Sequence, residues 1–227
     1  MEGVFRVRNC LVGLLRCRGK ALALAVLGGG LYALGFCGFD HATLAWICLI
    51  PILWALDDAT LTGRQALGVA WLFGLTIHLL TTPWLYTSLR SFFQLSATWA
   101  ALGYIGICVL HGSLYAVWGW SVHQLTHRAG APLVVAAPAT MVLVEWLWPS
   151  VFPWHLAASQ YRFTLILQTL DVWGPLGLSF IITLTSAVLY QTLAWRLRGR
   201  GSPGRAWLAL TLLAVTCLVY GAWARDR

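Results

Sequence analysis

Apolar runs long enough to cross a bilayer recur along this sequence, and they fix the solvent in which the chain folds. A spanning helix needs about 20 mostly apolar residues. Charged residues make up 10% of the chain, whereas soluble proteins carry about 25%, so too little polar surface exists to cover a soluble globule. The candidate spans are residues 19–37, 42–56, 66–85, 98–121, 131–149, 172–194 and 206–223. These runs predict an all-α, polytopic membrane protein with about seven transmembrane helices.

Two segments depart from a simple spanning pattern. The run 42–56 is short, contains Pro51 and ends at Asp57, so we expect it to tilt little or to lie partly re-entrant. Residues 86–96 mix polar and aromatic side chains and are typical of an interfacial segment rather than a span.

The predicted membrane domain covers residues 19–224, between a basic N-terminal segment, 1–18, and a short tail, 225–227. Basic residues before an apolar run also fit a secretory signal, with a weak cleavage site near Gly35. We favour an uncleaved first helix, because further apolar helices follow.

Basic residues predict the orientation, since they favour cytoplasmic loops. With the N-terminus in the cytoplasm, the segments on that side carry Arg6, Arg8, Arg16, Arg18, Lys20, Arg64, Arg128, Arg196, Arg198, Arg200 and Arg205. The opposite segments carry only Arg90, Arg162, Arg225 and Arg227. We therefore expect a multi-pass protein of the bacterial inner membrane, with a cytoplasmic N-terminus and an external C-terminus.

The net charge of +8 does not indicate a nucleic-acid partner, because the basic residues lie in short clusters between apolar runs. Attraction to anionic lipid headgroups explains them better. Most of the six cysteines lie in apolar stretches, without metal-ligand spacing. We expect no metal site and no cofactor.

Four groups of short motifs share an order along the chain. They are Gly35-Phe36-Cys37-Gly38-Phe39-Asp40 with Leu44-Ala45-Trp46 and Pro51–Leu56; Gly68 to Gly74 with Pro83-Trp84-Leu85-Tyr86-Thr87-Ser88-Leu89; Pro138 and Glu145-Trp146-Leu147 with Phe152-Pro153-Trp154 and Ser159-Gln160; and Gln168 with Gly174–Phe180. With these motifs the chain resembles the membrane half of the bacterial apolipoprotein N-acyltransferases over about two-thirds of its length.

The resemblance implies a lipid cavity below a nitrilase-like domain with a Glu-Lys-Cys triad. In that family a phospholipid acylates the catalytic cysteine, and the thioester then acylates a diacylglyceryl-cysteine at a lipoprotein N-terminus. Here the only lysine is Lys20, at the end of the first run opposite to Glu145. We therefore expect no catalytic residue in this chain and no acyl transfer by this chain alone.

Glu145 and the segment Phe152-Pro153-Trp154 form the first part of the candidate lipid site. A carboxylate inside an apolar helix normally faces a bundle interior or a wet cavity. Glu145 is therefore either a cavity-lining group that fixes the following loop or meets a lipid headgroup, or a structural hydrogen-bond anchor between helices. Phe152 and Trp154 are either the rim of a lipid-entry site or members of an aromatic belt.

The second part of the candidate site follows the third apolar run and contains Trp84, Tyr86 and Arg90. Arg90 is either a partner for a lipid phosphate or an interfacial anchor. His78 and His111 lie inside apolar runs, where an interhelical hydrogen bond explains them better than a metal. Asp40 is expected to cap the helix that follows.

The sequence therefore predicts a membrane platform that binds phospholipid and lipoprotein and acts with a separately supplied nitrilase-like catalytic subunit. A non-catalytic scaffold or lipid chaperone, bound to other membrane proteins, is the alternative. A small transporter is the weakest hypothesis, because no set of intramembrane charges outlines a path.

Overall fold

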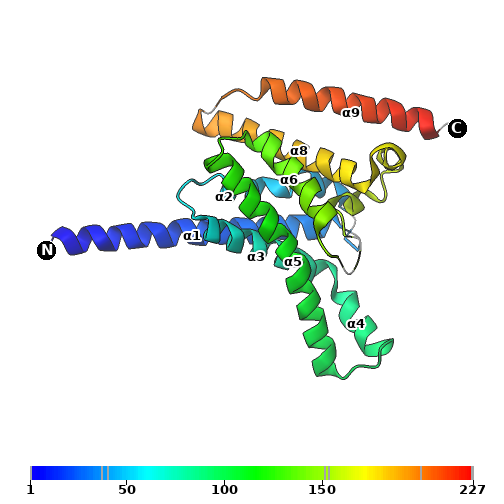
Figure 1. Ribbon diagram of the computed structural model, residues 1–227, viewed down its shortest axis with the longest axis horizontal. Helices are drawn as coiled ribbons and strands as arrows, with labels where there is room; N and C mark the ends of the chain where they lie inside the picture. Colours follow the sequence, from blue (N-terminus) through cyan, green and yellow to red (C-terminus); the bar gives the residue numbers. More distant parts are fainter. Residues whose placement is uncertain are drawn as a thin grey trace.

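The computed structural model consists of helices joined by short connections (Figure 1). It describes the backbone of residues 2–36, 38–39, 41–150, 152, 154–199 and 201–225, and the side chains of this set from residue 18 onward. Within these residues the elements are α1 (Glu2–Gly35), η1 (Ala42–Trp46), α2 (Leu49–Leu56), α3 (Gly63–Thr81), α4 (Pro83–Ser91), α5 (Ala97–His127), α6 (Leu133–Leu147), η2 (Leu156–Gln160), α7 (Thr164–Leu167), α8 (Leu170–Arg198) and α9 (Gly204–Arg225).

The predicted all-α membrane architecture is confirmed, but seven spans are not. Among the described residues, α5, α8 and α9 are each long and apolar enough to cross a membrane, and the bent pair α3 and α4 would make a fourth span. The run 42–56 forms a 3-10 helix followed by an eight-residue α-helix, which ends beside Asp57 as expected. The helix predicted over 19–37 begins earlier in the structure, at Glu2.

A bend of 53° separates α3 from α4, at a point where the sequence predicts an unbroken helix to residue 85. The hydroxyl of Thr82 donates to the carbonyl of His78, and Pro83 opens α4. Proline has no N–H, so it suits the first turn of a helix and interrupts a continuing one. Residues 86–91, the first part of the segment 86–96 expected to be interfacial, are helical in the structure.

Helix α4, the turn 92–96 and the first half of α5 project from the bundle as an arm (Figure 1). Aromatic side chains cover its end. Phe92 is 83% exposed, Phe93 63% and Trp99 67%. Their rings would lie in lipid or in the headgroup region, where aromatic residues are favoured.

Small residues hold α3 and α5 together inside the bundle. A Cβ atom on Gly74 would lie 2.6 Å from the carbonyl oxygen of Gly112, and one on Gly119 would lie 2.3 Å from the Cβ of Ala70. These separations show that the helix backbones approach closely, as in other membrane bundles. Trp118 fills the neighbouring core, and its indole N–H donates to the carbonyl of Ala137 on α6.

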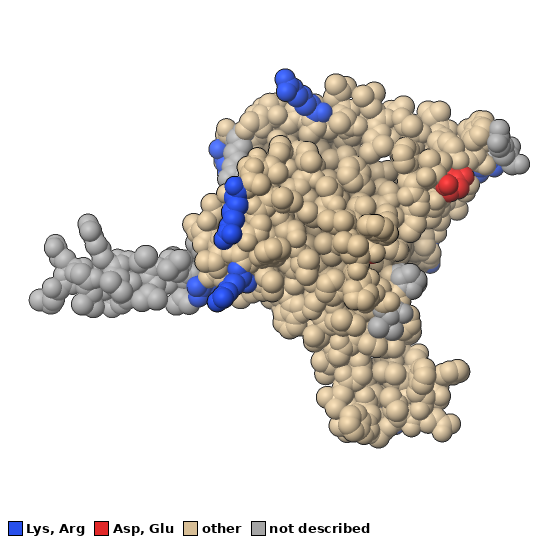
Figure 2. Space-filling view, in the orientation of Figure 1, with Lys and Arg blue, Asp and Glu red and all other residues tan. Residues whose placement is uncertain are grey.

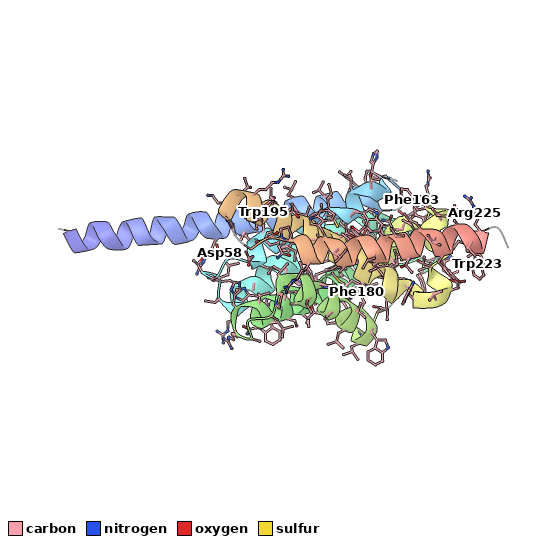
Figure 3. All side chains as sticks on the ribbon, turned by 90° about the horizontal axis from the view of Figure 1, so that it is seen from above. Asp58, Phe163, Phe180, Trp195, Trp223 and Arg225 are labelled. Atoms are coloured by element: carbon pink, nitrogen blue, oxygen red, sulfur yellow. The ribbon has the colours of Figure 1, made fainter. Side chains whose placement is uncertain are left out.

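The bundle has two ends with different chemistry. One carries residues 57–62 and the α5–α6 and α8–α9 connections, and Figure 2 shows most of the visible Lys and Arg side chains there. We call it the basic end. The other carries the connection between α6 and η2, and we call it the Trp154 end. Figure 3 places Asp58 and Trp195 at the basic end, and Phe163, Trp223 and Arg225 at the opposite end.

Candidate functional site

Glu145 organises the connection that carries Trp154. It lies near the C-terminal end of α6, and its side chain is 1% exposed. One carboxylate oxygen accepts the backbone N–H of Leu156 at 2.9 Å, and the other lies 3.2 Å from Nδ1 of His155. These contacts fit a group that fixes the following loop. They also fit a structural hydrogen-bond anchor, which was the alternative interpretation of Glu145.

Trp154 lies across the ends of two other helices. Its indole stacks on Phe36, with ring centroids 4.5 Å apart and an angle of 22° between the planes. It also meets the ring of His78 edge-on at 4.9 Å. The indole nitrogen is buried and has no hydrogen-bond partner. Trp154 therefore closes the bundle beside α1 and α3 rather than lying on its lipid-facing surface.

Trp84 and Phe152 form the outer part of the same aromatic group. Their ring centroids lie 5.8 Å apart, at an angle of 64°. Trp84 is 50% exposed and Phe152 is 37% exposed. Because the α3–α4 bend supplies one ring and the α6–η2 connection the other, the two predicted parts of the site meet here. We call Trp84, Phe152 and Trp154 the aromatic rim.

A cavity of about 460 Å³ lies against the other side of Glu145. Its lining includes Glu145, Trp148, Ser150, His155, Trp173 and Pro175. Gly174 breaks the helix within this wall, with φ 63° and ψ −177°, and Pro175 follows it. The cavity thus combines a carboxylate, an imidazole and a hydroxyl with indole rings, a mixture suited to a ligand that has a polar group beside apolar chains.

The remaining predicted site residues lie apart from the rim or outside the described residues. Tyr86 is 36% exposed on α4. Arg90 is exposed on the arm, where its Nη1 donates to the carbonyl of Leu95 at 3.3 Å. Pro153 of the candidate site, and Asp40 with its expected cap, lie outside the described residues.

His78 and His111 do not form the expected hydrogen bond. Their rings meet edge-on at 5.2 Å, and Nε2 of His111 is buried without a partner. The His78 ring instead lies between His111 and Trp154. Nowhere in the described part of the chain do three His, Cys, Asp or Glu side chains gather to hold a metal ion.

Sequence reasoning missed two residues whose contacts position the rim, Phe36 against Trp154 and His155 against Glu145. Phe36 belongs to the first motif and His155 follows the third, but neither was assigned a role at the site. Trp46 and Gln160 carried a signal, since both lie in the motifs: the Trp46 indole donates to the Gln160 side chain at 3.0 Å and links η1 to η2. Motifs far apart in sequence therefore contact one another.

The fold and site together define an all-helical membrane protein with an aromatic rim and a partly polar cavity at one end of its bundle. The domain family described as "Apolipoprotein N-acyltransferase N-terminal domain" matches residues 28–188. Similar proteins include the apolipoprotein N-acyltransferases of Geobacter metallireducens, 29% identical over 210 residues, and Pseudomonas syringae, 28% identical over 192 residues. The matches cover 87% and 81% of this chain.

The chain therefore belongs to the apolipoprotein N-acyltransferase family, through its N-terminal membrane domain. The matched parts cover only 39% of the Geobacter protein and 36% of the Pseudomonas protein. The similar protein of Chromobacterium violaceum is 25% identical over 214 residues, again 39% of its length. The resemblance inferred from the motifs is thus confirmed for the membrane domain.

Proposed function

We propose that this chain is the membrane platform on which acyl-lipid substrates are held for lipoprotein N-acylation. The chemistry would come from a nitrilase-like catalytic unit outside these 227 residues. Family membership supports the reaction class. The observation that carries the proposal is that Trp84 contacts Phe152 on the connection that also carries Trp154, while Glu145, which holds this connection, lines a cavity.

In this proposal the rim and the cavity have separate tasks. The exposed faces of Trp84 and Phe152 cover acyl chains of a phospholipid or lipoprotein that enters from the membrane. Glu145 holds the loop in place through the Leu156 N–H, so that Trp154 stays stacked on Phe36. The cavity beside Glu145 takes the polar portion of the lipid.

The described residues support a catalytic unit elsewhere. Lys20 is exposed on α1, whereas Glu145 is buried near the C-terminal end of α6 and contacts Leu156 and His155. The described cysteines Cys48, Cys108 and Cys217 are buried. A thiolate, a lysine and a carboxylate must lie within hydrogen-bond reach to activate a nucleophile and stabilise an oxyanion.

Aromatic substitutions test the platform. Native mass spectrometry of the purified full chain would measure the phospholipid retained by Trp154→Ala and Trp84→Ala, with Trp195→Ala as the control. Trp195 is 42% exposed at the basic end, away from the rim. We expect both rim variants to weaken lipid binding by about 2 kcal/mol, because desolvated aromatic anchors commonly contribute this much.

Trp84→Ala protects the test against misfolding, because Trp84 is half exposed whereas Trp154 packs against the core. Equal lipid retention by Trp84→Ala, Trp154→Ala and Trp195→Ala would show that the rim binds no specific lipid. The family assignment would still stand, but the platform role at this site would be wrong.

A further inference from the structure

An apolar groove adjoins the cavity beside Glu145, and we call it the α8 groove. Its volume is about 370 Å³. Trp173 and Leu176 line both spaces, so the two meet at these side chains. The rest of the groove wall comes from α6, α8 and α9: Val142, Gly177, Phe180, Ile181 and Leu213. Figure 3 shows Phe180 between the two ends of the bundle. The proposed function has so far assigned this groove no role.

The α8 groove leads away from the polar cavity along two helices. On α6, Val142 of the groove lies one turn before Trp146 of the cavity. On α8, the wall passes from Leu176 to Ile181, roughly 7.5 Å farther along a helix that rises 1.5 Å per residue. A molecule that fills both spaces therefore has a polar end beside Glu145 and an apolar part directed towards the middle of the bundle.

Glycine leaves the wall of the groove open on α8. A Cβ atom on Gly177 would lie 2.2 Å from the Cβ of Trp173, so position 177 cannot carry a side chain while Trp173 keeps its place. Trp173 comes directly before the break at Gly174, where φ is 63°, a conformation that glycine adopts without strain. The break thus places Trp173 in the wall of both spaces, and the groove has no side chain at position 177.

Helix α9 crosses the groove without filling it. Near one end of α9 the Trp207 indole donates to the hydroxyl of Thr192 at 2.8 Å, and near the other the Tyr220 hydroxyl donates to Asp171 at 2.7 Å. Leu213, between these two contacts, is the α9 side chain in the groove wall. Of the long helices α5, α8 and α9, the last is the least buried. The helix is therefore held near both ends, and apolar space lies beside its middle.

A polar cavity joined to an apolar groove selects an amphiphile. The cavity offers the carboxylate of Glu145, the imidazole of His155 and the hydroxyl of Ser150 to a polar group. Apart from the Trp173 indole, the side chains in the groove wall are apolar, so the groove fits a hydrocarbon chain.

A second apolar cavity beside α9 does not have this connection. Its volume is also about 370 Å³, and its lining includes Trp207, Leu210 and Leu218. It shares no wall residue with the cavity beside Glu145. A chain attached to a polar group at Glu145 is therefore directed into the α8 groove.

We propose that the α8 groove holds one acyl chain of the lipid whose polar portion lies beside Glu145. This inference rests on the proposed function and adds the path of the chain, which passes between α6, α8 and α9 and away from the aromatic rim. The rim remains open to a second chain. A phospholipid and a lipidated peptide both supply an acyl chain below a polar group, so the experiment includes each.

A photoreactive acyl chain tests the proposal. The purified full chain in detergent micelles would be cross-linked to equimolar phosphatidylglycerol that carries a diazirine near the end of one acyl chain, and mass spectrometry would map the labelled residues. A second arm uses a diacylated lipopeptide with the same diazirine, and the arm that labels the groove identifies the source of the chain. We expect labels on Phe180, Ile181 and Leu213, and we expect unlabelled lipid to compete for them.

Leu213→Trp should block the groove from α9. Overfilling a packed space commonly lowers binding about tenfold, so cross-linking to Phe180 and Ile181 should fall by this factor. Leu212→Trp is the matched control, because Leu212 is the neighbouring residue, is 62% exposed and does not line the groove. Val142→Phe fills the groove from α6 and should cause the same loss, which shows that the effect does not come from a local change in α9.

Three results would overturn the proposal: no groove labels in either arm, labels that unlabelled lipid does not reduce, or equal cross-linking in Leu213→Trp and Leu212→Trp. The platform and the groove fail separately. Unchanged labelling in Leu213→Trp, with lipid lost from the rim variants, would remove the groove and leave the platform. Groove labels that depend on Leu213, with normal lipid retention in the rim variants, would support the groove and remove the rim.

Discussion

The two ends of the bundle use a carboxylate in opposite ways. At the Trp154 end, Glu145 accepts a backbone N–H and contacts an imidazole, and both contacts hold a loop over the core. At the basic end, Asp57 pairs with Arg198 and accepts the hydroxyl of Tyr190 beside a cavity of about 430 Å³. The comparison shows that a buried acidic residue in a membrane bundle is explained by its partners. Both side chains are largely buried, so their burial alone does not tell the two carboxylates apart.

Aromatic residues at the two ends also differ in the kind of partner that their rings contact. Trp154 stacks on Phe36 and packs against the core, so its ring stabilises one arrangement of the loop. Trp54 lies under the Arg198 guanidinium and positions a charge. The first contact packs one ring on another, whereas the second places a guanidinium over an indole ring.

The largest expected effect is on a reporter fused to the C-terminus, because its activity depends on which end of the bundle faces the cytoplasm. We expect the basic end to face the cytoplasm, because basic residues are retained there. A reporter that is active only outside the cytoplasm, fused after Arg227, should then be active. A silent external reporter with an active cytoplasmic one would reverse the ends and contradict the orientation predicted from the sequence.

Removal of the Glu145 side chain should destabilise the protein most among the polar substitutions. Glu145→Ala leaves the buried Leu156 N–H without its acceptor and frees the loop, so we expect a loss of about 2–3 kcal/mol in the free energy of unfolding. Reversible unfolding in mixed micelles measures this. Glu145→Gln should lose less, because its amide oxygen still accepts the N–H.

Asp58 provides the matched control for Glu145. It is only partly buried, and its carboxylate accepts the N–H and hydroxyl of Thr60. Asp58→Ala should change the free energy of unfolding by about 0.5 kcal/mol or less, as is usual for surface positions. If Glu145→Ala and Asp58→Ala were equally mild, the anchoring role of Glu145 would be wrong, and the contrast between the two ends would disappear.

The smallest expected effect is the acyl-transfer activity of the chain alone. Purified protein mixed with phospholipid and a diacylated lipopeptide should transfer no acyl group above the protein-free control, because Lys20 is exposed on α1 while the buried Glu145 carboxylate is engaged by Leu156 and His155. Mass spectrometry of the lipopeptide measures the product. Turnover that disappears on substitution of one cysteine would contradict a platform without its own reaction centre.

Part of the site was accessible from the sequence because it depends on order along the chain. The position of Trp84 at the end of one apolar run, and of Phe152 just after another, predicted that both lie at one end of the bundle. The structure places their rings in contact. The end of the short run beside Asp57 was equally predictable, since charge stops an apolar helix.

Other features of the site depend on contacts that no local pattern records. Nothing in the run 66–85 distinguishes a straight span from the bend at Thr82, because Pro83 is compatible with either a kink or a new helix. The meeting of Phe36, His78 and Trp154 brings together α1, α3 and the α6–η2 connection. The number of spans predicted from the sequence is not confirmed, and the α3–α4 bend shows that helix length alone does not report how a run crosses the bundle.

The sequence by itself determined the solvent and the helical class, because apolar runs with little charge leave a bilayer as the medium, and runs of about 20 residues satisfy their backbone there as helices. It also determined the family, because the motifs keep their order. Only the tertiary structure decided that the Glu145 carboxylate meets Leu156 and His155, and that Asp57 pairs with Arg198. The reason is physical: a side chain acquires a role from the atoms packed around it, and those atoms come from helices far apart in the sequence.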